Sequence, residues 1–453
     1  MIDAQTLFSF FTDPILRAPT IGCMLMCLAA SLVGVVVFLR KQVLAGETLS
    51  HASYPGVIVG ILLAGFFFVQ ETDELKLALF TLGGAFTTSL LGLWIVHVLE
   101  RRMKLPSDAA LCFVLSTFFG VGLMLTSEVQ FSYTSLYKQV LTYLYGQAAT
   151  MTDIHIAIYG VLSFLVLVIV AWLYKEIQVL TFDRQYARSL GIRVKAIDAL
   201  LFILLTLAVI IGIRSVGVVL MSAMLIAPAV AARQFTNRLS VMFVLAGLFG
   251  MLSGFFGNFL SVQLTDYLAK HYAAARIVLP TGPMIVIVAS GICLMALLLA
   301  PERGLLVRLM RIAYFRYECI CENLLKAIWR LSPDAKVGLD QLAKYQASSR
   351  LYLQFILWRM KSNGWIHHLP DDSYQLTQDG QYRAAKIVRL HRLWEVYLVN
   401  YLGAHAERVH HNAEEMEHIL TPELEKELTL LLKDPKQDPH HQPIPPKEET
   451  HAL

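Results

Sequence analysis

The sequence predicts an all-α polytopic membrane protein with about nine transmembrane helices, followed by a smaller soluble part made of helices and a β-hairpin. Two observations support this fold class. The 453 residues are 56% hydrophobic and only 16% charged, whereas charged residues make up about 25% of a typical soluble domain. Long apolar runs fill residues 1–302, and beyond them charged and apolar residues alternate at helical spacing. We therefore expect two parts with different environments.

Apolar runs long enough to cross a bilayer, which takes about 20 helical residues, recur along the first part. They follow residues 1–19, a segment rich in Phe that we interpret as a short interfacial helix. The nine runs are 20–39, 53–70, 77–98, 107–126, 154–174, 197–213, 216–233, 240–264 and 281–300.

The basic residues between these runs indicate the orientation. They cluster in every second loop, for example Arg101, Arg102 and Lys104, whereas the alternate loop 71–76 is acidic. Because positively charged loops stay in the cytoplasm, nine spans place the N-terminus outside and everything after Arg303 inside. The sequence thus predicts a multi-pass protein of the inner (cytoplasmic) membrane, in contact with lipid, with a cytoplasmic C-terminal part.

The stretch 44–56 holds the first candidate site. Glu47 and His51 are four residues apart, so a helix places them on one face, where a carboxylate and an imidazole can bind manganese, iron or zinc. Pro55 lacks an N–H and frees the His51 carbonyl, which predicts a broken helix beside a cation path. Alternatively, Glu47 only favours a helix N-terminus and His51 is a packed interfacial residue. Ionisable residues in membrane segments are usually functional, which favours the metal path.

The same stretch resembles the Gly-Asp-Ala-Leu-Ser-His-Ala…Pro-Gly signature of bacterial ABC permeases that import zinc, manganese or iron. The stretches 181–191, 217–232 and 280–284 fit the same family, and the resemblance covers residues 10–302. It implies that Glu47 and His51 line the metal route. Glu47 stands where the family usually has Asp.

The resemblance also implies partners. The segment 181–191 resembles the cytoplasmic element that docks on the ATPase, with Asp183, Arg184 and Arg188 exposed on a short amphipathic helix; an ordinary polar loop is the alternative. The motif G-x-x-x-x-G-K-[ST] is absent from the sequence, so we expect ATP hydrolysis on a separate ATP-binding subunit and no enzymatic activity here. A periplasmic or extracellular metal-binding protein and a second permease, homologous or identical, would complete the system.

The soluble part begins with three short helices followed by a hairpin, the order of a winged helix. The third helix of such a domain enters the DNA major groove, and on it Arg350 and Gln354 share a face. We expect Leu351, Phe355 and Trp358 to point towards a core. The alternative is a winged helix used for protein contacts. The segments are 322–331, 338–345, 350–361 and a hairpin with its turn at 370–372.

Metal-capable side chains follow on two further helices. They are spaced i, i+4, i+7 and i+8 on the second helix and i, i+4 on the first, which places each group on one helical face. Imidazole and carboxylate without thiolate suit manganese or ferrous iron better than a structural zinc site. The residues are His391 and Glu395 on the first helix and His410, Glu414, Glu417 and His418 on the second.

This part resembles the DtxR-like, metal-dependent repressors, from the winged helix through 435–445. The resemblance implies that metal draws the first helix in and sets a DNA-binding dimer. The first-helix ligand position falls on Asn323, where aspartate or methionine is usual. Either Asn323 is a weak ligand through its amide oxygen, or the site is incomplete at that corner. The other implied metal positions are His391, Glu414, Glu417 and His418, with Glu395 and His410 as ancillary ligands.

Together these features predict a metal permease (1–302), a linker (303–320), a winged-helix DNA-binding domain (321–380), a metal-binding and dimerisation domain (381–445) and a disordered tail (446–453). A divalent metal, manganese or iron with zinc also possible, would be both substrate and co-repressor at operator DNA. Because a membrane tether limits access to DNA, we expect cleavage between about 304 and 320. The alternatives are a metal sensor that gates transport without binding DNA, and a secondary transporter.

Overall fold

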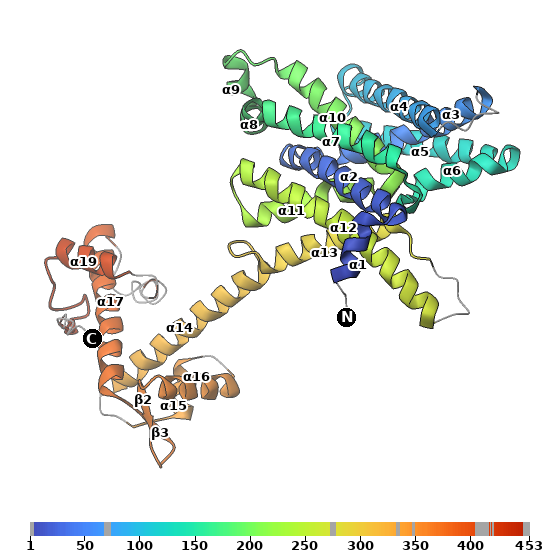
Figure 1. Cartoon of the computed structure of the whole chain (residues 1–453). Coiled ribbons are helices and arrows are strands. Elements are labelled where there is room, and N and C mark those ends of the chain that lie inside the picture. Colours follow the sequence, from blue (N-terminus) through green and yellow to red (C-terminus); the bar gives the residue numbers. More distant parts are fainter. Residues whose placement is uncertain are drawn as a thin grey trace. The chain divides into compact units, whose positions relative to one another are not determined.

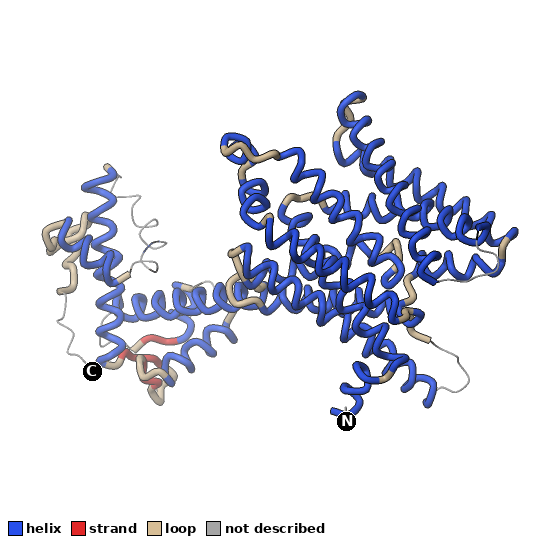
Figure 2. Tube along the Cα trace, turned by 45° about the horizontal axis from the view of Figure 1, so that its top comes forward, coloured by secondary structure: helices blue, strands red, loops and turns tan. Residues whose placement is uncertain are grey.

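The computed structural model of the chain describes residues 4–67, 74–271, 278–331, 336–346, 349–403, 416, 418 and 421–446. It divides into two compact units, Met1–Arg308 and Leu309–Leu453, each with its own hydrophobic core (Figure 1). Helices make up most of both units, and the β-strands of the described residues all lie in the second unit (Figure 2).

The first unit is built of helices. They are α1 (Ala4–Thr12), α2 (Pro14–Leu39), α3 (Val43–Phe67), α4 (Glu74–Arg102), α5 (Ser107–Ser132), α6 (Thr134–Tyr145), the 3-10 turn η1 (Ala148–Thr150), α7 (Asp153–Trp172), α8 (Tyr174–Phe182), α9 (Arg184–Ser189), α10 (Val194–Val216), α11 (Met221–Phe235), α12 (Leu239–His271) and α13 (Thr281–Leu299).

Eight of the described helices are long and apolar enough to cross a membrane. They coincide with eight of the nine predicted runs, and the exception is 216–233. There α11 has only 15 residues, a length of about 22 Å, whereas the hydrocarbon core of a bilayer is about 30 Å thick. This short helix packs against α2, α12 and α13, and most of its apolar side chains are buried.

A turn at Gly217 separates α10 from α11. Its φ of 94° lies in the region that favours glycine. A second glycine turn, at Gly146 after α6, packs directly against it. The Val218 N–H donates to the Tyr143 carbonyl at 3.1 Å. This contact between distant segments ends α10, and α11 begins only at Met221.

Helix α3 is continuous through Pro55, so the predicted break in this helix is wrong. Membrane helices tolerate proline where neighbouring helices and local adjustments satisfy the freed backbone groups. Here α4 supports α3 closely, because a Cβ added at Gly56 would lie 2.0 Å from the carbonyl oxygen of Gly84. The two backbones therefore touch, as in other membrane interfaces built of small residues.

The second unit contains helices and a small sheet. The last turns of its first helix, α14, belong to the core of this unit. The elements are α14 (Leu305–Leu331), β1 (Val337–Gly338), α15 (Leu339–Tyr345), α16 (Arg350–Ser362), β2 (Ile366–His368), β3 (Ser373–Leu376), α17 (Gln378–Leu402) and α19 (Pro422–Leu431).

The predicted hairpin is present. Strands β2 and β3 pair antiparallel with Ile366 opposite Leu376, and β1 adds a third strand on the other side of β3. In the turn between β2 and β3 the Leu369 N–H donates to the Ser373 carbonyl at 2.9 Å, and Asp372 has a φ of 58°. Helices α14, α15 and α16 precede the β2–β3 hairpin, which is the element order of a winged helix.

The predicted core face of α16 is wrong. Leu351, Phe355 and Trp358 are exposed, by 81%, 51% and 61%. The buried stripe is instead Leu353, Ile356, Leu357 and Met360. Both sets recur at helical spacing, because apolar residues occur on nearly all sides of this helix. Periodicity alone therefore could not select the buried face.

Two further predicted segments lie at the two ends of the second unit. Residues 303–320, predicted as a linker, lie mostly within α14. Of the predicted tail, 446–453, only Pro446 lies within the described residues. The segment before it packs on α17, where the Arg389 Nη1 group donates to the Pro445 carbonyl at 2.8 Å.

Candidate metal sites

The first candidate site lies on α3. Glu47 is the fifth residue of this helix, beyond its first turn, so a stabilising effect on the helix N-terminus does not account for it. His51, one turn later, is buried, and Glu47 is half-buried. The Nδ1 atom of His51 has no hydrogen-bond partner among the described residues. A buried imidazole nitrogen without a partner is a position that a ligand can fill.

Contacts of His51 and of its neighbours on α3 hold this part of the helix in place. The ring of Phe119 on α5 meets the His51 ring edge-on, with centroids 4.6 Å apart. The Ser50 hydroxyl donates to the Val218 carbonyl at 2.5 Å. The hydroxyl groups of Tyr54 and Thr126 are 2.7 Å apart. The polar contacts of α3 thus reach both α5 and the turn before α11.

The predicted docking segment forms two short helices, α8 and α9. The Asp183 carboxylate caps α9 by accepting from the backbone N–H groups of Gln185 and Tyr186, both at 2.9 Å. Arg184 and Arg188 are exposed, as is Tyr186. The Arg184 guanidinium also lies 2.6 Å from the Asp198 carboxylate of α10. The segment is therefore an ordered, exposed element and not an irregular loop.

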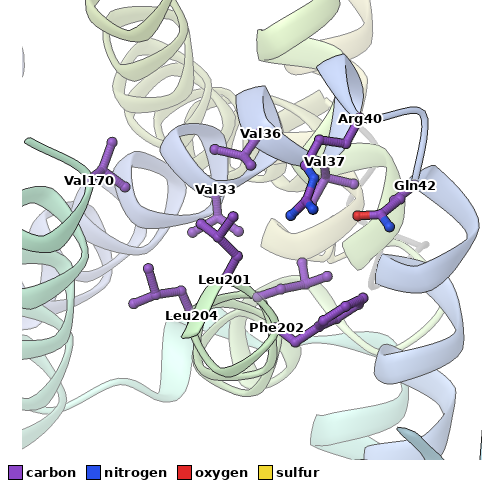
Figure 3. Close-up of a pocket in the computed structure, with 10 residues that line it drawn as sticks. Val33, Val36, Val37, Arg40, Gln42, Val170, Leu201, Phe202 and Leu204 are labelled. Carbon is purple, nitrogen blue, oxygen red and sulfur yellow. The ribbon is translucent and has the colours of Figure 1, made fainter. Parts of the chain in front are cut away.

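Arg40, at the end of α2, forms a second ion pair with Asp198. Figure 3 shows Arg40 and Gln42 beside a pocket that α2, α7 and α10 line with valine, leucine and phenylalanine side chains. The pocket has a volume of about 20 Å³, which is room for one water molecule. Its lining is apolar apart from these two residues, so it does not resemble a metal site.

The second unit brings His391 and Glu395 together on α17. The Nε2 atom of His391 is 3.1 Å from the Glu395 carboxylate, and both side chains are 2% exposed. A cavity of about 440 Å³ opens at this pair. It is lined by Trp329, Arg330, His391, Arg392, Glu395, Asp438, His440, Gln442 and Pro443.

His418 contacts the first helix of this unit. Its Nδ1 atom is 2.5 Å from the Oε2 atom of Glu322 on α14. The contact comes from Glu322 and not from Asn323, the residue predicted at the first-helix position. The remaining predicted ligands, His410, Glu414 and Glu417, lie outside the described residues. Within the described parts of the chain, no three His, Cys, Asp or Glu side chains converge on one point.

Sequence reasoning missed Glu322, Asp438 and His440 as neighbours of these groups. Asp438 and His440 belong to the segment 435–445, whose only signal was a pair of adjacent histidines. The Asp438 carboxylate accepts from the His440 and Gln442 backbone N–H groups at 2.9 and 2.8 Å. It also pairs with Arg392 at 3.4 Å. These contacts fix the segment 435–445 beside the His391–Glu395 pair.

The predicted DNA-contacting residues are both exposed on α16. Arg350 lies 3.2 Å from Asp340 of α15, an exposed ion pair, and Gln354 follows one turn later. Apolar side chains surround them, including Leu351 and Phe355. The exposed side of α16 is therefore more apolar than the sequence analysis predicted.

Comparison with known proteins shows the family of the chain. A family model for the ABC 3 transport family matches residues 12–300. The chain belongs to this family. It is a multi-pass membrane permease subunit and not an enzyme. A second model, the metal-binding and dimerisation domain of iron-dependent repressors, matches residues 377–446. The resemblance to metal-importing ABC permeases, joined to a DtxR-like metal-binding domain, is confirmed.

Two relatives of this ABC 3 permease match it over most of their own length and most of this chain. A probable metal transport system membrane protein of Chlamydia trachomatis is 36% identical over 442 residues, 96% of this chain and 97% of the relative. The manganese transport system membrane protein MntC of Bacillus subtilis is 31% identical over 381 residues, 84% of this chain and 83% of MntC.

The fold of the permease part also has a solved counterpart. The structure of PsaBC from Streptococcus pneumoniae in complex with Fab covers 69% of this chain and 100% of the matched chain, with a TM-score of 0.54 and 23% identity. The predicted all-α membrane fold followed by a DtxR-like domain is confirmed.

Proposed function

We propose that this permease imports a divalent transition metal, with manganese as the first candidate and iron and zinc as the others. One observation carries the proposal. His51 is buried on α3 with its Nδ1 atom unpartnered among the described residues, one turn from Glu47. Imidazole and carboxylate are ligands that manganese, iron and zinc accept. The name of the B. subtilis relative, a manganese transport protein, supports the same substrate class.

In the proposed mechanism Glu47 and His51 hand the cation inward while the permease alternates its access. ATP is hydrolysed by a separate subunit that docks on the segment around α9, through Asp183, Arg184 and Arg188. An extracellular or periplasmic metal-binding protein delivers the cation, and a second permease completes the pathway. The permease lies in the inner (cytoplasmic) membrane, with its C-terminal unit in the cytoplasm.

Uptake of radioactive manganese tests this proposal in cells that express the whole system and lack other manganese importers. We expect Glu47→Gln and His51→Ala to lose most ATP-dependent uptake. Glu128→Gln and His97→Ala are matched controls, because these residues are of the same types and exposed on α5 and α4. Normal uptake by both α3 variants would refute the site. Uptake that persists without the ATP-binding subunit would indicate a secondary transporter.

We further propose that the second unit is a metal-responsive repressor, with Arg350 and Gln354 contacting operator DNA. The order of α14, α15, α16 and the β2–β3 hairpin supports this, because the third helix of a winged helix enters the major groove. The co-repressor metal is the imported one, bound through His391, Glu395, His410, Glu414, Glu417 and His418.

One observation favours a second candidate function for this unit. Leu351, Phe355 and Trp358 are exposed on α16 beside Arg350 and Gln354, and large apolar side chains on a surface suit protein contacts. In that case the unit senses metal and gates transport without binding DNA.

A gel-shift assay separates the two functions. The fragment 309–453, which has its own core, is mixed with DNA from upstream of its operon, with manganese or with chelator. Repression predicts a manganese-dependent shift that Arg350→Ala weakens and His391→Ala abolishes. Metal binding without a shift, combined with metal-dependent inhibition of uptake, would support the gating function.

A membrane-bound repressor can reach only nearby DNA. We therefore propose that the chain is cleaved between about 304 and 320, near the start of α14. An antibody against the second unit should detect a soluble fragment in native cells. A full-length band as the sole species would contradict cleavage.

A further inference from the structure

Glu322 is the residue of α14 that reaches His418. The Oε2 atom of Glu322 is 2.5 Å from the Nδ1 atom of His418, and the His418 side chain is 8% exposed. An ionised carboxylate only accepts hydrogen bonds, so the proton of this bond lies on Nδ1. In the neutral imidazole the lone pair is then on Nε2, which becomes the metal-binding nitrogen.

This arrangement matches a common feature of metal sites. A histidine that binds a metal usually donates its other ring N–H to a carboxylate, which fixes the tautomer and the ring orientation and makes the ligand more basic. The donor set fits a divalent cation that prefers nitrogen and oxygen ligands.

We propose that Glu322, and not Asn323, is the first-helix residue that controls metal binding, by positioning His418. The inference deepens the proposed function of the second unit and rests on it. Successive residues of a helix point about 100° apart. With Glu322 turned to His418, Asn323 therefore faces a different direction. Asn323 replaces the expected acidic ligand in sequence, and Glu322 supplies the carboxylate one position earlier.

The position of Glu322 also connects metal binding to the winged helix. Leu324, Leu325 and Ile328 follow it on α14 and are at most 1% exposed. They belong to the same core as Ile356 and Leu357 of α16. Because close-packed protein interiors transmit strain, fixing the orientation of α14 through Glu322 and His418 also constrains the position of α16.

The test measures manganese binding to the full chain in detergent by equilibrium dialysis, in a Glu47→Ala background that removes the transport site. We expect Glu322→Ala to weaken binding 10- to 100-fold, as loss of such a carboxylate does elsewhere. Glu322→Gln should restore part of this loss, because its amide oxygen also accepts a hydrogen bond. Asn323→Ala is the matched control and should stay within about twofold.

A double mutant isolates the positioning role. If Glu322 acts through His418, adding Glu322→Ala to His418→Ala weakens binding no further. Binding unchanged in Glu322→Ala, or weakened equally in Asn323→Ala, would overturn the inference. Binding unchanged in both His418→Ala and His391→Ala would instead show that the proposed function of the unit has failed. Circular dichroism checks that each variant folds. If Glu322→Ala does not fold, the isosteric Glu322→Gln takes its place, and the inference then requires that Glu322→Gln binds manganese more weakly than the chain with Glu322 does.

Discussion

Asp198 should be a strong determinant of permease stability. Its carboxylate, 22% exposed, pairs with Arg40, whose side chain is 7% exposed, and with the more exposed Arg184. Asp198→Asn leaves the Arg40 guanidinium buried without a counter-charge, and breaking a fully buried pair costs about 3–5 kcal/mol. Because Asp198 is partly exposed and asparagine still accepts a hydrogen bond, we expect a loss of about 2 kcal/mol in the free energy of unfolding.

An exposed pair provides the control. Lys270 and Asp266 lie 2.6 Å apart on α12 with side chains 68% and 56% exposed, and such pairs contribute less than about 1 kcal/mol. Asp266→Asn should therefore have little effect. Arg184→Ala should also have a small effect, because that side chain is 52% exposed.

The assay uses the cysteines of α2. Cys23 and Cys27 are fully buried, so a thiol-reactive dye labels them only when this helix becomes exposed during heating. Serine replaces Cys112, Cys293, Cys319 and Cys321, so that the signal comes from α2 alone. Equal midpoints for Asp198→Asn and Asp266→Asn would refute the argument that burial of Arg40 decides the effect.

Two further predictions follow from packing and charge. Gly56→Ala should prevent the close approach of α3 and α4 and destabilise the detergent-solubilised chain by at least about 1–3 kcal/mol. Gly83→Ala should be nearly neutral, because an added Cβ there meets no atom within 4 Å; equal thermal midpoints for the two variants would contradict this. Hydrogen bonds from Lys436, which has the larger effect, and from Arg389 hold the pKa of Asp434 below its ordinary value of 3.8. Ionised Asp434 thus stabilises the second unit fully above pH 3.8, and this stabilisation is lost as the pH falls through the lower folded-state value. Asp434→Asn should flatten the acid side of the stability curve of fragment 309–453 in urea titrations, and an unchanged curve would contradict the assignment.

Local rules of the sequence predicted most of the helices, and contacts between distant segments decided the differences. The length of the apolar runs was enough to predict eight of the membrane-length helices, because a bilayer imposes a minimum length on any helix that crosses it. The same rule failed at 216–233, where the turn at Gly217 is set by its contact with the turn at Gly146. At Pro55 the local rule predicted a break, and packing of Gly56 on α4 overrides it.

In the candidate sites, too, local spacing predicted some contacts, whereas contacts between distant segments were not predictable. The spacing of His391 and Glu395 identified a pair that the structure brings to 3.1 Å, because residues four apart meet on any helix. Glu322 and His418 are 96 positions apart, and sequence periodicity contains no information on such a contact. On α16 two apolar stripes competed, and only packing within the core of the second unit distinguishes the buried residues from the exposed ones.

The two units present the same kinds of ligand in different numbers, and this bears on which unit selects the metal. Glu47 with His51, and His391 with Glu395, are both carboxylate–imidazole pairs one helical turn apart. Sites with the same donors rank divalent metals in the same order, so discrimination must come from ligand number and geometry. The second unit adds His418 with its carboxylate partner Glu322, whereas the ring contact of His51 is with Phe119. A site with more ligands imposes a coordination geometry, and a two-ligand path does not. If both proposed sites hold a metal, the second unit should therefore discriminate between divalent metals more sharply than the Glu47–His51 pair.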